Sequence, residues 1–153
     1  MLVTSTAEDW VKGFEAGWRD PSSPHDFVEH FLPMLDPGVR MVQPQLPTLV
    51  GHEQFRTGFA EPLFAMIPDL HGAVTGWAAD GELIFIDLVL EGTVGGRPMQ
   101  VEGVDRIKLR DGLCVERVAF FDPSPLLLAV LRRPSAWPRF ARIQLKQMIR
   151  RTR

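Results

Sequence analysis

The hydrophobic pattern of the chain changes near residue 68 and divides the sequence into two parts. Before that point, large apolar residues recur every three or four positions, which is typical of helices with one buried face. After it, apolar and polar residues alternate, which is typical of strands with one buried face. The pattern therefore predicts an α+β fold in which helices pack on one face of a sheet.

Three helices are predicted in the first part, at residues 7–18, from Ser23 to residue 35, and from about residue 52. Thr6 is expected to cap the first helix, and Pro62 to kink or end the third. A short strand is expected at residues 39–43. The buried faces of the helices carry aromatic residues at helical spacing: Phe14, Trp18, Phe27, Phe31, Phe55 and Phe59.

Four strands are predicted in the second part, at residues 70–77, 83–91, 99–110 and 113–122. The pairs Asp80-Gly81, Gly95-Gly96 and Asp111-Gly112 are strong hairpin turns, so the strands form an antiparallel meander. A short apolar segment follows at residues 126–131. A curved, mostly antiparallel sheet wrapped over three N-terminal helices leaves a conical cavity at its open end.

Composition and length are those of a single globular domain of 153 residues, 45% of them hydrophobic. The only cysteine, Cys114, excludes an internal disulfide and is expected to be an inert thiol. Neither a signal peptide nor an apolar run long enough for a membrane helix is visible, so we expect a cytoplasmic protein. The histidines show no metal-binding spacing, and we expect neither a metal nor a cofactor.

Charge divides the chain at residue 131. Eight of the 17 Arg and Lys residues follow it without any Asp or Glu, which leaves nine basic against 19 acidic residues before it. We therefore expect a domain at residues 1–131, with a net charge of −10, and a basic helical tail at residues 132–153. The acidic body argues against nucleic-acid binding.

The tail has two interpretations. A helix at residues 136–150 would place Arg139, Arg142, Lys146 and Arg150 in one basic stripe beside apolar residues, which is typical of a weak membrane-surface contact. Alternatively, the acidic body or a second subunit attracts this helix, and its cations stay solvated.

Asp105 and Asp87 are the acidic residues expected near the cavity. In residues 101–109, Asp105 alternates with apolar residues while the opposite face carries cations, so Asp105 points inward. The direction of Asp87 depends on the hairpin register. A two-residue Gly95-Gly96 turn sets Ile86 opposite Asp105 and leaves Asp87 outside, whereas a three-residue loop with a bulge sets Asp87 opposite Asp105.

The element order and several segments resemble the NTF2-like superfamily, which includes SnoaL-like polyketide cyclases, ketosteroid isomerases and limonene-epoxide hydrolases. The segments are VGHEQF before the third helix, IDLVLEGTVGGRP, and GVDRIKLRDGLCVERVAFFD. The resemblance covers residues 7–131 and implies a cone-shaped fold. It supports the fold more strongly than any activity.

Epoxide hydrolases of this superfamily use an Asp–Arg–Asp set, with a Tyr and an Asn that hold water. By resemblance, Asp87 matches one acid, which favours the inward register. Phe85 stands where the Arg would be and Ala119 where the second Asp would be. Gln43 replaces the Asn and Met41 the Tyr, so that set is broken.

Ketosteroid isomerases use an Asp base, a Tyr, and a protonated Asp that stabilises the enolate. By resemblance, Asp105 matches the protonated Asp. Gln43 occupies the position of the base, and the chain contains no tyrosine. This set is incomplete as well.

Two hypotheses follow. In the first, Asp87 and Asp105 share an apolar cavity and act as acid and base on a small lipophilic molecule of polyketide, steroid or terpenoid type. In the second, the protein is a non-catalytic module that binds a lipophilic ligand or dimerises through the aliphatic sheet face. A homodimer is expected in either case. The residues expected to line the cavity are Phe14, Trp18, Met41, Gln43, Phe59, Phe85, Val89, Val101 and Phe121.

Overall fold

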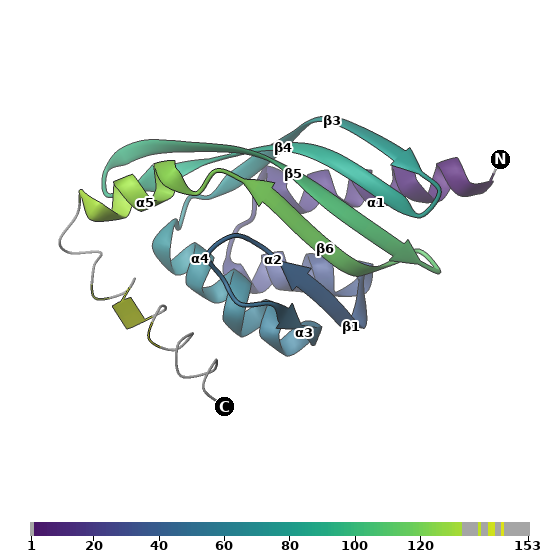
Figure 1. Cartoon of the computed structure of the whole chain (residues 1–153), viewed down its shortest axis with the longest axis horizontal. Coiled ribbons are helices and arrows are strands. Elements are labelled where there is room, and N and C mark those ends of the chain that lie inside the picture. The colour runs from purple at the N-terminus through teal and green to yellow at the C-terminus, as the bar shows by residue number, and fades with distance from the viewer. Residues whose placement is uncertain (1, 133–137, 139–140, 143–144, 146–153) are drawn as a thin grey trace.

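Helices cover one face of a curved sheet in the computed structural model of the chain (Figure 1). The structure describes residues 2–132, 138, 141, 142 and 145. The helical elements are α1 (Leu2–Arg19), α2 (Pro24–Phe31), the 3₁₀ turn η1 (Leu32–Met34), α3 (Gly51–Gln54), the π-helical segment η2 (Phe55–Ala60), α4 (Glu61–Met66) and α5 (Ser124–Leu131). The strands are β1 (Leu35–Val42), β2 (Leu49–Val50), β3 (His71–Asp80), β4 (Leu83–Val94), β5 (Arg97–Arg110) and β6 (Leu113–Phe121).

Within the described residues, six strands form one sheet in the order β2-β1-β6-β5-β4-β3. Strands β3 to β6 form the predicted antiparallel meander, while β1 joins β6 in parallel and pairs with β2 in antiparallel fashion. In Figure 1, β4 and β5 curve over α2, α3 and α4, and α5 lies at one end of the sheet. The predicted α+β architecture with a curved, mostly antiparallel sheet is confirmed.

Aromatic side chains fill the space between the helices and the sheet. Trp18 and Phe27 meet with ring centroids 4.8 Å apart, and Phe27 and Phe31 with centroids 4.7 Å apart. Phe55 and Phe59 stack at 5.7 Å. Burial of each large side chain contributes about 1.5–3 kcal/mol, so this cluster fixes α2 and η2 beneath the sheet.

The predicted ends of the first two helices are partly wrong. Helix α1 begins at Leu2, so Thr6 lies inside it rather than capping it. Ser23 does cap α2, because its side chain accepts a hydrogen bond from the Asp26 N–H at 3.0 Å. Leu35 begins β1 instead of ending α2. The strand continues through Gly38, whose N–H donates to the Asp36 carboxylate, and a register shift against β6 accommodates this irregularity.

Pro62 does not end the third helix. Elements α3, η2 and α4 run without a break from Gly51 to Met66. The π-helical register persists to Glu61, whose N–H donates to the Arg56 carbonyl five residues earlier. Pro62 then occupies the second residue of α4, where a missing N–H is tolerated. The wider π-helical turn thus absorbs the proline inside a continuous helix.

The helix predicted at residues 136–150 falls mostly outside the described residues and stays a prediction, as does the division of the chain at residue 131. Among the residues that the structure does describe, no helix is both long enough and apolar enough to cross a membrane.

Gly103 is expected to be essential for close pairing of β5 with β6. A Cβ at this position would lie 2.8 Å from the Phe120 carbonyl oxygen and 2.9 Å from the Phe121 Cβ. Because backbone atoms cannot move aside cheaply, we expect Gly103→Ala to lower the free energy of unfolding by about 1–3 kcal/mol in urea titrations.

Gly76→Ala on β3 is the matched control for this substitution. A Cβ at Gly76 would lie 3.6 Å from the Asp87 carboxylate, which is ordinary contact. We expect this variant to be neutral or slightly more stable, because alanine has less freedom in the unfolded chain. Equal losses in both variants would contradict the packing argument.

Candidate functional site

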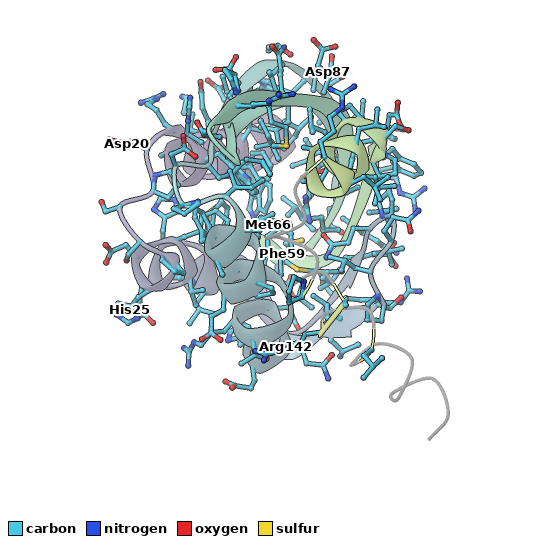
Figure 2. All side chains as sticks on the ribbon, turned by 90° about the vertical axis from the view of Figure 1, so that its left-hand side faces the viewer. Asp20, His25, Phe59, Met66, Asp87 and Arg142 are labelled. Atoms are coloured by element: carbon cyan, nitrogen blue, oxygen red, sulfur yellow. The ribbon has the colours of Figure 1, made fainter. Side chains whose placement is uncertain are left out.

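The hairpin between β4 and β5 settles the direction of Asp87. Val94 pairs with Arg97, which sets Ile86 opposite Asp105 and Asp87 opposite Val104. Asp105 is 4% exposed and points inward, as predicted. Asp87 is exposed on the outer face, and Figure 2 shows it at the edge of the molecule, far from Phe59 and Met66 near the centre. The hypothesis that the two aspartates share a cavity is therefore wrong.

Two glycines cause this outcome. Gly95 and Gly96 have φ values of 71° and 73°. Positive φ at both central residues is the signature of a two-residue type I′ turn, whose twist matches that of the strands. A three-residue loop with a bulge, which would have turned Asp87 inward, is absent from this hairpin.

The inward partner of Asp105 is Arg117 on β6. Its Nε donates to Asp105 Oδ2 at 2.7 Å and its Nη2 to Oδ1 at 3.2 Å, so the pair is bidentate. Both side chains are buried, and the guanidinium carbon lies 5.2 Å from the centre of the Phe59 ring. Charge-assisted hydrogen bonds and the aromatic face together compensate for the lost hydration of both groups.

A bulge in β6 brings Arg117 to this position. Leu109 pairs with Cys114, but Lys108 pairs with Glu116, so the register shifts by one residue between them. Without the shift, Glu116 rather than Arg117 would share the inner face with Asp105. Glu116 instead lies outside, 2.9 Å from Arg40. The inward direction of Arg117 could not be predicted, because nothing in the sequence marks the bulge.

Gln43 extends this polar group. Its Oε1 accepts a hydrogen bond from Arg117 Nη1 at 3.3 Å, and its side chain is buried, with 7% exposure. A guanidinium only donates, so it fixes which end of the amide faces Arg117. The Nε2 group of Gln43 consequently points elsewhere, and no acceptor for it exists among the described residues.

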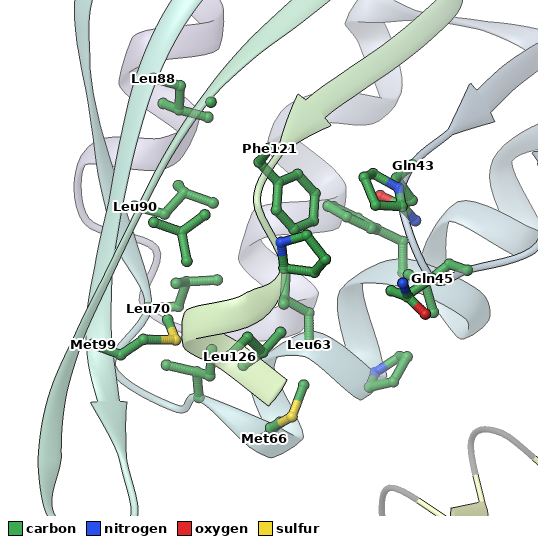
Figure 3. A pocket seen from close by; sticks show the side chains of 18 of the residues that line it. Gln43, Gln45, Leu63, Met66, Leu70, Leu88, Leu90, Met99, Phe121 and Leu126 are labelled. Carbon is green, nitrogen blue, oxygen red and sulfur yellow. The ribbon is translucent and has the colours of Figure 1, made fainter. Parts of the chain in front are cut away.

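A pocket of about 150 Å³ begins at this polar group. Gln43, Asp105 and Arg117 line one part of it, and the rest is almost entirely apolar. Figure 3 shows Leu70, Leu88, Leu90 and Met99 on one side and Gln43 across from them. Met66 of α4 and Leu126 of α5 lie toward its outer end (Figure 3). The pocket therefore suits an apolar molecule with one polar end.

Part of this lining was predicted from the sequence. Five of the nine residues expected there line the pocket: Trp18, Gln43, Phe59, Val101 and Phe121. Phe14 and Met41 point inward too, but they lie in the adjoining aromatic core. Phe85 and Val89 were placed wrongly, because they share the outer face of β4 with Asp87. The apolar lining from α4 and α5 was not predicted.

The aliphatic face of β4 is also not a dimer surface. Ile84 and Ile86 are fully buried beneath the sheet, and Leu88 is nearly so. A homodimer stays a prediction, but it cannot use that face. Among the described residues, no group of His, Cys, Asp and Glu could hold a metal ion.

Comparisons with known proteins agree with the fold. Residues 10–117 match the family model described as a SnoaL-like domain. No curated protein matches the sequence. A structure described as a SnoaL-like polyketide cyclase, from Jannaschia sp. CCS1, aligns with a TM-score of 0.70 at 20% identity, over 85% of this chain and 94% of its own.

Two further structures show the range of the fold. A protein from Catenulispora acidiphila with a ketosteroid isomerase-like fold aligns with a TM-score of 0.67 at 20% identity, over 78% of this chain and 90% of its own. An LEH-like epoxide hydrolase from M. tuberculosis aligns with a TM-score of 0.65 at 13% identity, over 84% and 91% respectively. Likeness at these identities shows the fold alone.

Removal of only one partner of the buried ion pair is expected to lower the stability of the protein strongly. Arg117→Met leaves Asp105 buried without its cation, and we expect a loss of about 3–5 kcal/mol in the free energy of unfolding. Adding Asp105→Leu to this variant should restore much of the loss. The control is Arg110→Met, which removes an exposed pair with Asp36 at 3.4 Å and should cost less than about 1 kcal/mol. Similar losses in both single variants would contradict the assignment.

Cys114 is expected to be unreactive while the chain is folded. Burial raises the pKa of its thiol to about 12, although the positive charge of Arg117 partly opposes the shift. Since the thiolate is the nucleophile, the folded protein should react with Ellman's reagent at mildly alkaline pH at least ~100-fold more slowly than the chain unfolded in guanidinium chloride. Equal rates in the two states would show an accessible thiol.

Proposed function

Because this chain belongs to the SnoaL-like domain family, we propose that its pocket binds a small lipophilic molecule and performs general acid–base chemistry on it. The ligand carries an oxygen that accepts hydrogen bonds, such as the oxygen of a carbonyl group. The reaction is of isomerase, cyclase or hydrolase type and involves a carbon next to that carbonyl group. This proposal is supported by neighbours of the same fold that are described as a SnoaL-like polyketide cyclase and as an LEH-like epoxide hydrolase.

The observation that carries this proposal is the unpartnered amide donor of Gln43. A buried N–H group without an acceptor costs about 1–3 kcal/mol, so it is seldom retained without a use. Gln43 lines the pocket, and its orientation is fixed by Arg117. A ligand oxygen would supply the missing acceptor.

The volume of the pocket bounds the ligand. Apolar cavities of about 150 Å³ hold a molecule the size of benzene. The pocket of this chain has about that volume, so it encloses roughly one ring. Any larger part of the ligand would extend past α4 and α5.

Each polar group then has a distinct role. Gln43 Nε2 donates to the carbonyl oxygen, and the positive charge of Arg117 stabilises the negative charge that develops there. Asp105 takes the proton from the neighbouring carbon, and the electron pair of that C–H bond moves into the enolate. Each oxygen of Asp105 accepts one hydrogen bond from Arg117 and keeps a second lone pair for the proton. Returning the proton to another carbon completes an isomerisation.

One observation favours the non-catalytic alternative. Both oxygens of Asp105 already accept hydrogen bonds from Arg117, and the second carboxylate expected beside it lies on the outer face. In that case the same three residues would only orient a bound ligand. Exchange of the α-protons of a bound ketone distinguishes the catalytic function from ligand binding alone.

The test uses cyclohexanone as a monocyclic ketone. We expect the wild-type protein to accelerate exchange of its α-protons in heavy water, measured by proton NMR. Asp105→Asn should lower the protein-dependent rate by about 10²–10⁴-fold, as expected for loss of a general base. Asp87→Asn is the matched control, since it neutralises an exposed carboxylate on the outer face, and should leave the rate unchanged.

Ketone binding is measured in parallel by saturation-transfer NMR. Binding that Gln43→Leu weakens, without any exchange above the buffer rate, would assign the protein to the binding alternative. Absence of both binding and exchange would contradict the recognition of a carbonyl oxygen.

A further inference from the structure

Helix α5 carries apolar side chains on two sides. Leu126 and Leu127 line the pocket, whereas Leu128 and Leu131 are 50% and 62% exposed. A helix on a protein surface normally places polar residues on its outer side. The sequence of α5, SPLLLAVL, contains no charged residue at all. Its outer side therefore favours contact with an apolar partner.

Two arginines flank these exposed leucines. Leu128, Leu131 and Arg132 share one face by their spacing of three and four residues. Arg97, at the start of β5, lines the same groove as Leu128 and Arg132. In the part of the chain that the structure describes, neither guanidinium pairs with a carboxylate. Leucines and unpaired cations thus lie together beside the outer end of the pocket.

The sequence adds further positive charge at this end. Arg132 is the first of eight Arg and Lys residues that follow Leu131 without any Asp or Glu. The preceding residues carry nine basic against 19 acidic groups. The sequence is therefore strongly basic after residue 131 and strongly acidic before it.

We propose that the outer side of α5, with Arg97 and Arg132 beside it, docks onto an anionic lipid bilayer. The leucines insert between acyl chains and the cations bind the phosphate and carboxylate groups of the lipids. The acidic remainder of the chain is repelled by the same surface, which orients the molecule with α5 toward the bilayer. A lipophilic ligand then reaches the pocket past Leu126 and Leu127 without crossing bulk water.

Other partners fit these features less well. A nucleic acid would attract the cations but would gain nothing from exposed leucines. A second copy of the chain would cover the leucines but would bring the like charges of Arg97 and Arg132 in the two copies together. An anionic bilayer satisfies both the apolar and the cationic parts of the surface.

Sedimentation with lipid vesicles tests the proposal on the full chain. Binding is expected to phosphatidylcholine vesicles that contain phosphatidylserine, to be weak without phosphatidylserine, and to fall as salt is raised. Leu131→Glu should weaken binding by about tenfold, and Leu128→Glu with Leu131→Glu by more. Arg97→Gln with Arg132→Gln should weaken binding while retaining the leucines.

The control is Val50→Glu, which adds the same charge at a residue that is 52% exposed on β2. This strand lies next to α3 and away from α5 in Figure 1. Val50→Glu should bind vesicles as the wild type does. Circular dichroism and urea midpoints establish that each variant is folded.

Three results would overturn the proposal. One is the absence of binding to anionic vesicles. Another is salt-sensitive binding that the leucine substitutions leave unchanged, which would indicate a purely electrostatic partner such as nucleic acid. The last is a dimer, seen by light scattering without vesicles, that Leu131→Glu dissociates and Val50→Glu does not.

Discussion

The buried ion pair between Arg117 and Asp105 is the interaction on which the inner end of the pocket depends. Two opposite charges inside a protein persist only if their hydrogen bonds replace those they made with water. Here the bidentate geometry, the Phe59 ring and Gln43 meet that requirement. In doing so they orient the Gln43 amide and leave its Nε2 donor unpartnered. The unused donor is thus a direct consequence of the way the charges are neutralised.

The arrangement of the strands determines which side chains take part. A tight turn at Gly95-Gly96 directs Asp105 inward and Asp87 outward. A bulge in β6 then directs Arg117 inward and Glu116 outward. The turn keeps the β4–β5 register regular and the bulge shifts the β5–β6 register by one residue, and in a sheet a change of one residue exchanges the two faces. The identity of the polar group therefore depends on two local features of the backbone.

The two ends of the pocket differ in their physical character. The inner end holds charges and an amide in a dry environment, where electrostatic interactions are strong. The outer end is lined by α4, by α5 and by the loop at residues 44–46, and it is mostly apolar. Leu126 and Leu127 face the pocket while Leu128 and Leu131 face outward, so one short helix forms part of both the pocket and the protein surface. Because α5 borders both, a ligand that leaves the lipid surface proposed for α5 would enter the pocket directly.

The sequence by itself determined the three helical regions of the first part, the short strand near residues 39–43, the meander, the positions of its turns and the inward direction of Asp105, but not the two-residue strand β2 or the helical form of α5. Periodicity and glycine-containing turns are signals carried by residues close together in sequence. They predict the fold correctly because local preference and tertiary burial favour the same arrangement at these residues. The sequence also placed Trp18, Gln43, Phe59, Val101 and Phe121 near one cavity.

Tertiary structure alone decided the partner of Asp105 and the direction of Asp87, Phe85 and Val89. The pattern of β4 by itself favours burial of its aliphatic face with Asp87 outside, as the structure shows, but the sequence left two hairpin registers open and the resemblance favoured the wrong one. The face was chosen by pairing with β5, which is a contact between strands and leaves no mark in the pattern of one strand. Arg117 was overlooked for the same reason, because the bulge that turns it inward exists only when β6 pairs with β5.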